Sequence, residues 1–227
     1  MATLVHSLRG PALASVLLAQ WANIPTTIAA DLLHGRTLVD PVLRPVRGFG
    51  ASDRLAGAAV TALCEPADYG AVHHAIAVAE PGQVILIEAG ARVDVAMIGE
   101  LLCGSARQKG IKGVAVNGAV RDTGTLARLT DFVVFTRGIT ARGPASMDRG
   151  VVNDTMVFAG VHVTPGDLVL GDDDGLVIIP RGRVEELLPV ALSKLQSEQQ
   201  WERALSQGRT TLEVFGVPEP IRVRQDS

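Results

Sequence analysis

The chain has 227 residues, of which 47% are hydrophobic and only 20% are charged, and its mean hydropathy is +0.27. This length fits one domain, or one domain with an appendage, and the apolar excess predicts contacts between subunits. A net charge of −3, the lack of a Lys/Arg-rich stripe and an aromatic content of 4% argue against direct binding of nucleic acid.

The first fifty residues predict two short helices and a loop. Residues 11–21 predict the first helix, because their apolar side chains recur at helical spacing. The second helix is predicted over 28–33, with residues 26–27 as N-cap candidates and Gly35 as its end. Residues 41–53 contain turn formers and predict a loop with irregular extended pieces.

The central part of the chain alternates short apolar runs with helical patterns. Strands are predicted where an apolar run is bounded by turn formers, and helices where apolar residues recur every three or four positions. The predicted strands are 57–64, 84–88, 113–116 and 132–136, and the predicted helices are 69–79, 96–109 and 123–129.

After Pro144 the pattern changes to short extended segments separated by turns. We interpret the acidic run 172–175 as a turn between two strands, because no spaced set of calcium ligands follows it. A charged amphipathic helix is predicted over 183–205. The alternation of strands and helices, followed by a run of strands, predicts an α/β fold with a mixed sheet and helices on one side.

Cysteine usage and the N-terminal sequence bear on the cellular compartment. Cys64 and Cys103 are too few for a disulfide framework or a thiolate metal site, and we expect both to be small buried hydrophobes. The apolar run 11–22 lacks a convincing basic flank, and no run reaches the length of a membrane span. We therefore expect a cytoplasmic protein with no membrane partner.

Glu100 and Arg121 are the candidate catalytic residues, and Asp122, next to Arg121, is the candidate metal ligand. They stand where an apolar stretch gives way to a predicted helix, and such junctions expose side chains and free N–H groups in α/β proteins. The arginine can stabilise an oxyanion, one carboxylate can hold a divalent metal, and the other can move a proton. Solvated surface charges, with an ion pair between Arg121 and Asp122, are the alternative.

Gly99, Glu100, Leu101 and Leu102 begin a helical run and are the candidate substrate-binding residues. The first N–H groups of a helix have no internal partner, and its dipole favours a substrate carboxylate there by about 0.3–1 kcal/mol per charge. A plain helix start is the alternative. Asp122 is the predicted metal ligand, and a site with so few carboxylates suits Mg²⁺ or Mn²⁺ better than zinc.

Other polar residues are weaker candidates. His73 and His74 are adjacent in a predicted helix, so they point in different directions and cannot easily share one metal. Arg137 and Arg142 close the strand that follows the Arg121–Asp122 pair. They either line the same cleft or face solvent.

The order and spacing of these motifs resemble the class II pyruvate aldolases of the 4-hydroxy-4-methyl-2-oxoglutarate aldolase family, which also contains the RraA-type regulators of ribonuclease activity. The resemblance is carried by the segments 99–102, 113–122, 135–144, 160–161, 165–167 and 172–180. It covers roughly residues 26–180. We therefore treat 1–227 as a single RraA-like domain with a core over about 26–180, and we treat residues 11–21 and 183–205 as helical appendages.

The resemblance implies a β/β/α swivelling-type fold that assembles as a homotrimer or homohexamer with active sites between subunits. It also implies that the amides of residues 100–102 hold a pyruvate carboxylate, that Arg121 holds the pyruvyl oxygen and that Asp122 binds Mg²⁺. Glu100 would order a water that relays protons. Glu100 and Asn117 depart from the family, in which Asp is common at both positions.

Our hypothesis from the sequence is a divalent-metal-dependent carbon–carbon lyase. It would cleave 4-hydroxy-2-oxo acids that bear a second carboxylate, releasing pyruvate, with oxaloacetate decarboxylation as a side activity. The alternative is a non-catalytic RraA-type regulator that binds a ribonuclease. That role requires no metal ligand at Asp122.

Overall fold

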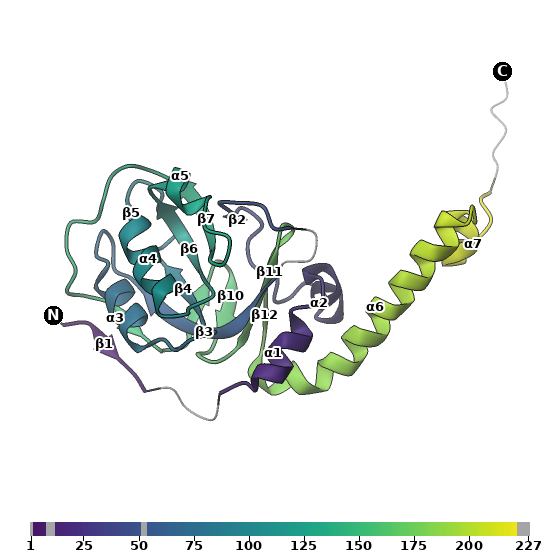
Figure 1. Ribbon diagram of the computed structural model, residues 1–227, viewed down its shortest axis with the longest axis horizontal. Helices are drawn as coiled ribbons and strands as arrows, with labels where there is room; N and C mark the ends of the chain where they lie inside the picture. Colours follow the sequence, from purple (N-terminus) through teal and green to yellow (C-terminus); the bar gives the residue numbers. More distant parts are fainter. Residues whose placement is uncertain (1, 8–11, 51–53, 222–227) are drawn as a thin grey trace, which may run out of the picture.

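The structure is a computed structural model that describes residues 2–7, 12–50 and 54–221 (Figure 1). The helices are α1 (Ser15–Trp21), α2 (Thr26–Leu32), α3 (Gly70–Val78), α4 (Glu100–Gln108), α5 (Thr123–Leu126), the 3₁₀ turn η1 (Arg181–Arg183), α6 (Val184–Ser206) and α7 (Thr211–Phe215). The strands are β1 (Leu4–Val5), β2 (Arg44–Pro45), β3 (Leu55–Leu63), β4 (Val84–Glu88), β5 (Ala96–Ile98), β6 (Gly113–Val120), β7 (Val133–Ile139), β8 (Val151–Val152), β9 (Met156–Phe158), β10 (Val161–Val163), β11 (Leu168–Asp172) and β12 (Gly175–Ile179).

A parallel four-stranded core, β3-β4-β6-β7, forms the centre of the molecule. Its edges are extended by β8 and β1 on one side and by β2 on the other. Strand β3 is long enough to pair with three strands: its first half lies antiparallel to β11, its second half lies parallel to β4, and its end also pairs with β8. The sheet is therefore mixed, as the sequence predicts.

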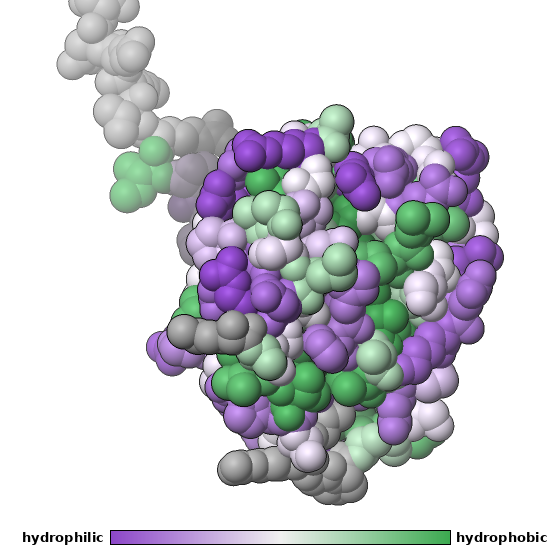
Figure 2. All heavy atoms as spheres, turned by 90° about the vertical axis from the view of Figure 1, so that its left-hand side faces the viewer, coloured by the Kyte–Doolittle hydropathy of each residue, from purple (hydrophilic) through white to green (hydrophobic). Residues whose placement is uncertain are grey.

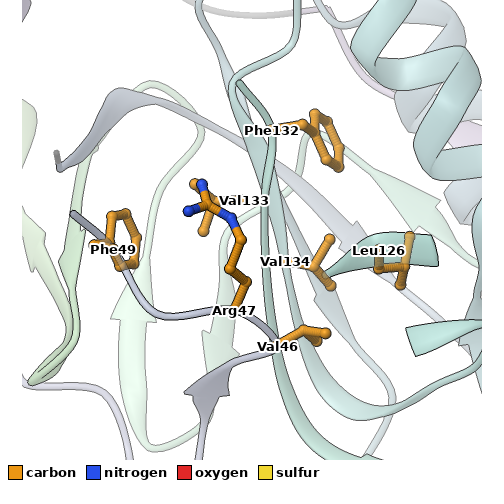
Figure 3. A pocket seen from close by; sticks show the side chains of 7 residues that line it. All are labelled: Val46, Arg47, Phe49, Leu126, Phe132, Val133 and Val134. Carbon is orange, nitrogen blue, oxygen red and sulfur yellow. The ribbon is translucent and has the colours of Figure 1, made fainter. Parts of the chain in front are cut away.

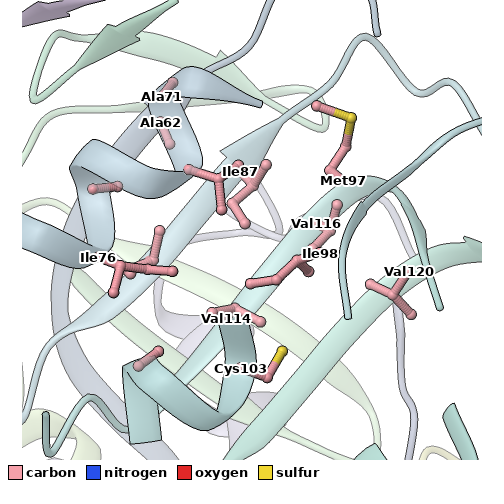
Figure 4. Close-up of a cluster of buried hydrophobic side chains, with 14 of the residues drawn as sticks. Ala62, Ala71, Ile76, Ile87, Met97, Ile98, Cys103, Val114, Val116 and Val120 are labelled. Atoms are coloured by element: carbon pink, nitrogen blue, oxygen red, sulfur yellow. The ribbon is translucent and has the colours of Figure 1, made fainter. Parts of the chain in front are cut away.

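Alternate residues of these strands point to opposite faces, as the pleat of a strand requires. On one face, Ile87, Val114 and Val116 pack beneath α3 and α4 (Figure 4). On the other face, Val84 and Leu86 pack against β9–β12. The result is the β/β/α layering that the resemblance implies, and both faces of the parallel core are covered by apolar side chains.

The hairpin β11–β12 brings a further layer that the sequence interpretation did not include. Val169 faces the parallel core, whereas Leu168 and Leu170 face α1, α2 and α6. Trp21 lies fully buried in this outer cluster, and its indole N–H donates to the carbonyl of Val184 at 3.1 Å. The expectation of helices on one side only is wrong, because both faces of this apolar hairpin need cover.

Two predicted boundaries shift beside the candidate site. The predicted helix 96–109 is a buried strand, β5, followed by α4, because residues 96–98 pair with the end of β6. The predicted strand 113–116 continues to Val120. Arg121 therefore follows the strand directly, and the helix predicted over 123–129 shortens to α5.

The N-terminal predictions are partly outside the described residues. The first helix begins at Ser15, and residue 11 is not described. Helix α2 begins at Thr26 without a side-chain cap of its own; instead Asp172 accepts from the Thr26 backbone N–H at 2.9 Å and from its hydroxyl at 2.6 Å. The loop 41–53 is confirmed over its described part, with β2 as a short extended piece.

The C-terminal helix is confirmed with bounds one residue later than predicted. The first half of α6 packs through Val184, Leu187 and Ala191, and the rest projects from the body of the molecule (Figure 1). At its far end Trp201 meets Phe215 of α7, with ring centroids 5.4 Å apart. Within the described ranges, no helix is both long and apolar enough to cross a membrane.

Candidate functional site

Asp122 turns the chain sharply where β6 ends. Its backbone adopts the left-handed conformation, with φ 58° and ψ 33°. Aspartate and asparagine tolerate this conformation better than other residues with side chains. The turn directs the carboxylate to the start of α4, where the backbone N–H of Glu100 donates to Oδ2 at 3.0 Å. Two segments that are 22 residues apart are joined at this point.

Gly99 allows this approach because it has no side chain. A Cβ at this position would lie 2.5 Å from Oδ2 of Asp122 and 2.7 Å from Cγ of Arg121. Gly143 has a similar role on the other side of the arginine, since a Cβ there would lie 2.7 Å from Nη1 of Arg121. Two glycines therefore shape the space that the arginine and the aspartate occupy.

Arg121 and Asp122 face the same space and form only a long ion pair with each other. Nε of Arg121 lies 3.8 Å from Oδ2 of Asp122, and the side chains are 44% and 42% exposed. Within the described chain, the guanidinium of Arg121 makes no hydrogen bond, and Oδ1 of Asp122 accepts none. The sequence alternative of a surface ion pair is present in this weak form, but both side chains keep free atoms for a ligand.

The start of α4 offers two free amides rather than three. The N–H of Glu100 is taken by Asp122, and Cys103 already donates to the carbonyl of Gly99. The N–H groups of Leu101 and Leu102 lie between them and have no partner among the described residues. They are the two donors that remain for an anion at this helix end.

A cavity of about 200 Å³ brings the predicted residues together. Its lining consists of Tyr69, His73, Ala96, Met97, Ile98, Gly99, Leu101, Leu102, Arg121, Asp122 and Pro144. Glu100 is the one predicted site residue outside this lining; its side chain is exposed on the first turn of α4. Met97 and Ile98 line the cavity and also belong to the buried apolar cluster (Figure 4).

The metal-binding atoms of the site fit Mg²⁺ or Mn²⁺ and do not fit zinc. In the described part of the chain, no three His, Cys, Asp or Glu side chains cluster as metal ligands. A tetrahedral zinc site needs three or four such ligands, so these residues do not fit zinc. A single carboxylate with a free oxygen, as in Asp122, fits Mg²⁺ or Mn²⁺, which take their other ligands from water and substrate.

Sequence reasoning missed a partly buried polar network at the carboxyl ends of the parallel strands. Glu88 ends β4 and accepts two hydrogen bonds from Nδ2 of Asn117, at 2.9 and 2.8 Å. Oδ1 of Asn117 accepts from Nε of Arg137 at 2.7 Å, and Nη2 of Arg137 donates to Asp40 at 2.6 Å. Arg137 therefore neither lines the cavity nor faces solvent. The available signal in the sequence was a polar side chain directly after each of two apolar runs, Glu88 after 84–87 and Asn117 after 113–116.

Electrostatics support structural roles for several groups outside the cavity. A hydrogen bond from the Val42 amide, and then one from Arg137, hold the pKa of Asp40 below its ordinary value. Burial raises the pKa of the Cys64 and Cys103 thiols to about 12. Both cysteines are free and buried, which confirms the prediction of small buried hydrophobes.

A second hollow, beside β7, is too small to be a ligand site. It encloses about 10 Å³, which is space for about one water molecule. In Figure 3 the side chain of Arg47 lies between Phe49 and the strand that carries Val133. Arg47 donates to the carbonyls of Leu129 and Thr130, at 2.9 and 3.1 Å, so this arginine anchors its loop.

A comparison with known protein families identifies the family of this chain. Residues 26–178 match the RraA-like family, described as Aldolase/RraA. The chain belongs to this family. The match covers most of the core that the sequence resemblance indicated, and it includes every residue of the cavity and of the Glu88–Asn117–Arg137–Asp40 network.

The relatives of this RraA-like protein have names that state different functions. A protein of Halalkalibacterium halodurans with the provisional name 4-hydroxy-4-methyl-2-oxoglutarate aldolase is 34% identical over 83% of this chain and 88% of its own. A structure from Pseudomonas syringae pv. tomato has a TM-score of 0.81 at 25% identity, covering 93% of this chain and all of that one. The RNA-processing inhibitor RraA of Thermus thermophilus has a TM-score of 0.61 at 30% identity, covering 69% and 92%.

Proposed function

We propose that this protein is a divalent-metal-dependent carbon–carbon lyase that cleaves 4-hydroxy-2-oxo acids to pyruvate. One observation supports the proposal above all others. Arg121, Asp122 and the free amides of Leu101 and Leu102 border one cavity, within reach of a molecule the size of pyruvate. The relative named as an aldolase supports the same reaction class.

The 2-oxo acid end of the substrate fits the positive side of this cavity. The N–H groups of Leu101 and Leu102 hold the carboxylate, since they are free and stand at a helix N-terminus. The guanidinium of Arg121 stabilises negative charge as it develops on the C2 oxygen. A Mg²⁺ or Mn²⁺ ion on Oδ1 of Asp122 would supply Lewis-acid polarisation of the 2-oxo group.

Glu100 acts as the proton-relay residue in this proposal. Its carboxylate, on the exposed first turn of α4, orders a water that removes the proton from the C4 hydroxyl. The C3–C4 electron pair then passes to C3, the C4 oxygen becomes a carbonyl, and the pyruvate enolate forms against Arg121. Protonation at C3 releases pyruvate. Oxaloacetate that loses CO₂ gives the same enolate, so decarboxylation is the expected side activity.

We also propose that the site works within a homotrimer or homohexamer. Leu101, beside the cavity, is 83% exposed, and the apolar Ile139 and Met147 are 65% and 62% exposed. Figure 2 shows apolar areas that interrupt the polar surface on one face of the molecule. Contact with a neighbouring subunit would cover such residues. Size-exclusion chromatography with light scattering measures the mass of the assembly, and a monomeric mass would contradict this proposal.

The structure named as an RNA-processing inhibitor supports a second candidate, a non-catalytic regulator that binds a ribonuclease. This function uses an outer surface and needs no free carboxylate oxygen at Asp122. Co-purification with a ribonuclease, from a protein that releases no pyruvate, would favour it.

The decisive experiment is a substrate panel coupled to pyruvate detection. The purified protein is incubated with Mg²⁺ or Mn²⁺ and with 4-hydroxy-2-oxo acids or oxaloacetate, and then with EDTA. The proposal predicts pyruvate release that EDTA abolishes and Mg²⁺ restores. Absence of pyruvate from every substrate would refute it.

A further inference from the structure

Some polar side chains of the cavity have a role in the proposed reaction and others have none. Four of the lining residues carry polar side-chain groups, namely Tyr69, His73, Arg121 and Asp122. Arg121 and Asp122 serve the 2-oxo acid end in the proposed reaction. Tyr69 directly precedes α3 and His73 lies in the first turn of that helix, and the reaction as described gives neither a role.

His73 has an unsatisfied polar atom. Its Nε2 is buried and has no hydrogen-bond partner among the described residues. Such atoms are rare in folded proteins because the lost hydration is not replaced, and each one calls for an explanation. The ring packs against Tyr69, whose ring centroid lies 4.7 Å away in an edge-to-face arrangement. An acceptor atom of a bound ligand would satisfy this nitrogen.

We propose that His73 determines substrate specificity by donating a hydrogen bond from Nε2 to the second carboxylate of a dicarboxylic 4-hydroxy-2-oxo acid. This inference rests on the proposed function. The first carboxylate takes the Leu101 and Leu102 amides and the C2 oxygen takes Arg121, so both are already assigned. Asp122 is negative and repels a carboxylate.

Apolar residues form the rest of the lining and offer no side-chain donor to a second carboxylate. The remaining side-chain donors are those of Tyr69 and His73, and of these two only His73 has a buried polar atom without a hydrogen-bond partner among the described residues. Tyr69 packs against the imidazole through its ring. The cavity therefore favours a dicarboxylic substrate over one that ends in a methyl group.

His74 provides a matched control, because it is the adjacent histidine of α3 and is exposed outside the cavity. The variants are His73→Leu, His73→Gln and His74→Leu. Each is assayed with a pair of 4-hydroxy-2-oxo acids that differ only in carrying a carboxylate or a methyl group on C4. The readout is the ratio of kcat/KM for the dicarboxylic substrate to kcat/KM for the monocarboxylic one.

We expect His73→Leu to lower this ratio roughly 10- to 100-fold, the size expected for a hydrogen bond to a charged group. His73→Gln keeps a side-chain donor and should lower the ratio less. His74→Leu should leave it within about twofold of the wild type. Equal losses with both substrates, or no loss, in His73→Leu would overturn the specificity role while leaving the lyase proposal intact.

A binding measurement separates this role from catalysis and from folding. Neither 2-oxoglutarate nor 2-oxopentanoate has a C4 hydroxyl, so the proposed cleavage cannot occur and their dissociation constants report binding alone. His73→Leu should weaken 2-oxoglutarate selectively, with a thermal midpoint close to that of the wild type. Equal weakening of both ligands would overturn the inference. A wild type that cleaves neither substrate of the kinetic pair would refute the proposed function and this inference together.

Discussion

The backbone N–H of Glu100 donates a 3.0 Å hydrogen bond to Oδ2 of Asp122. This contact fixes the direction of the carboxylate and uses one of the first amides of α4. It leaves Oδ1 of Asp122 free for a metal and the amides of Leu101 and Leu102 free for an anion. The geometry of the site depends on how closely these two segments approach.

Gly99→Ala should disable the site while leaving the fold intact. The new Cβ would lie 2.5 Å from Oδ2 of Asp122 and 2.7 Å from Cγ of Arg121, so both side chains must move. Displacement of catalytic groups by about 1 Å can cost on the order of 100-fold in rate. We therefore expect kcat/KM for pyruvate release to fall by about this factor.

Gly104→Ala is the control, because this glycine lies in the same helix and a Cβ there meets no atom within 4 Å. It should retain activity and gain about 0.5–1 kcal/mol of stability, since alanine favours a helix interior. Full activity in Gly99→Ala would show that the close approach is unimportant.

Asp122→Asn should weaken the binding of Mg²⁺ and Mn²⁺. Asparagine tolerates the left-handed backbone and can still accept from the Glu100 amide, so the turn should persist. It lacks the charge that a hard divalent cation prefers. Calorimetric titration with Mn²⁺ should give at least about tenfold weaker binding. Asp94→Asn, which removes an exposed partner of Arg92, is the control. Unchanged affinity in Asp122→Asn would place the metal elsewhere.

Asp68→Asn should lower stability. The buried Asp68 carboxylate accepts hydrogen bonds from the Ser146 hydroxyl and from the backbone amides of Gly70, Asp148 and Arg149. An asparagine would turn its NH₂ group toward some of these donors. Chemical denaturation should show a loss of about 1.5–3 kcal/mol in the free energy of unfolding. A change below about 0.5 kcal/mol, the low end for one typical hydrogen bond, would contradict this role.

The same carboxylate predicts a pH dependence. Burial would raise the pKa of Asp68, but the hydrogen bonds from Ser146, Gly70, Arg149 and Asp148 outweigh it and hold the pKa well below its ordinary value. A lowered folded-state pKa stabilises the protein above the unfolded value of about 3.9, and this contribution is lost as the pH falls below that value. The wild type should lose stability more steeply below about pH 4 than Asp68→Asn does. Parallel pH profiles would contradict this.

Arg137→Met should destabilise the strand ends without touching the cavity. It removes the donor to Asn117 and the partner of Asp40, and the side chain is only 18% exposed. Leaving Asn117 Oδ1 without its donor should cost about 1–3 kcal/mol in the free energy of unfolding. Arg92→Met breaks an exposed pair and should change it by at most about 1 kcal/mol. Equal effects in the two variants would contradict the bridging role.

Local patterns predicted much of this fold. The strand β4 and the turn between β11 and β12 follow from short apolar runs and from the acidic residues that separate them. The closeness of Arg121 and Asp122 to Gly99 followed from strand–helix junctions together with the family resemblance. The cavity contains most of the predicted residues because such junctions meet at one edge of a parallel sheet.

Long-range partners could not be predicted in this way. Residues 96–98 have a helical pattern, and only pairing with β6 makes them a strand. The cap of α2 comes from Asp172, which is 146 residues away from Thr26. Arg137 has its partners on β6 and in the loop before β2, so its burial became visible only when these elements were assembled.

The central claim is that Arg121 stabilises the negative oxygen of a pyruvate-derived enolate, and Arg121→Ala tests it most directly. Removal of one donor to such an oxygen typically costs 10²–10³ in kcat, or about 2.7–4 kcal/mol of barrier. We predict that Mg²⁺-dependent pyruvate release falls by roughly this factor while the thermal midpoint stays close to that of the wild type. Pyruvate release at the wild-type rate from folded Arg121→Ala would contradict the account.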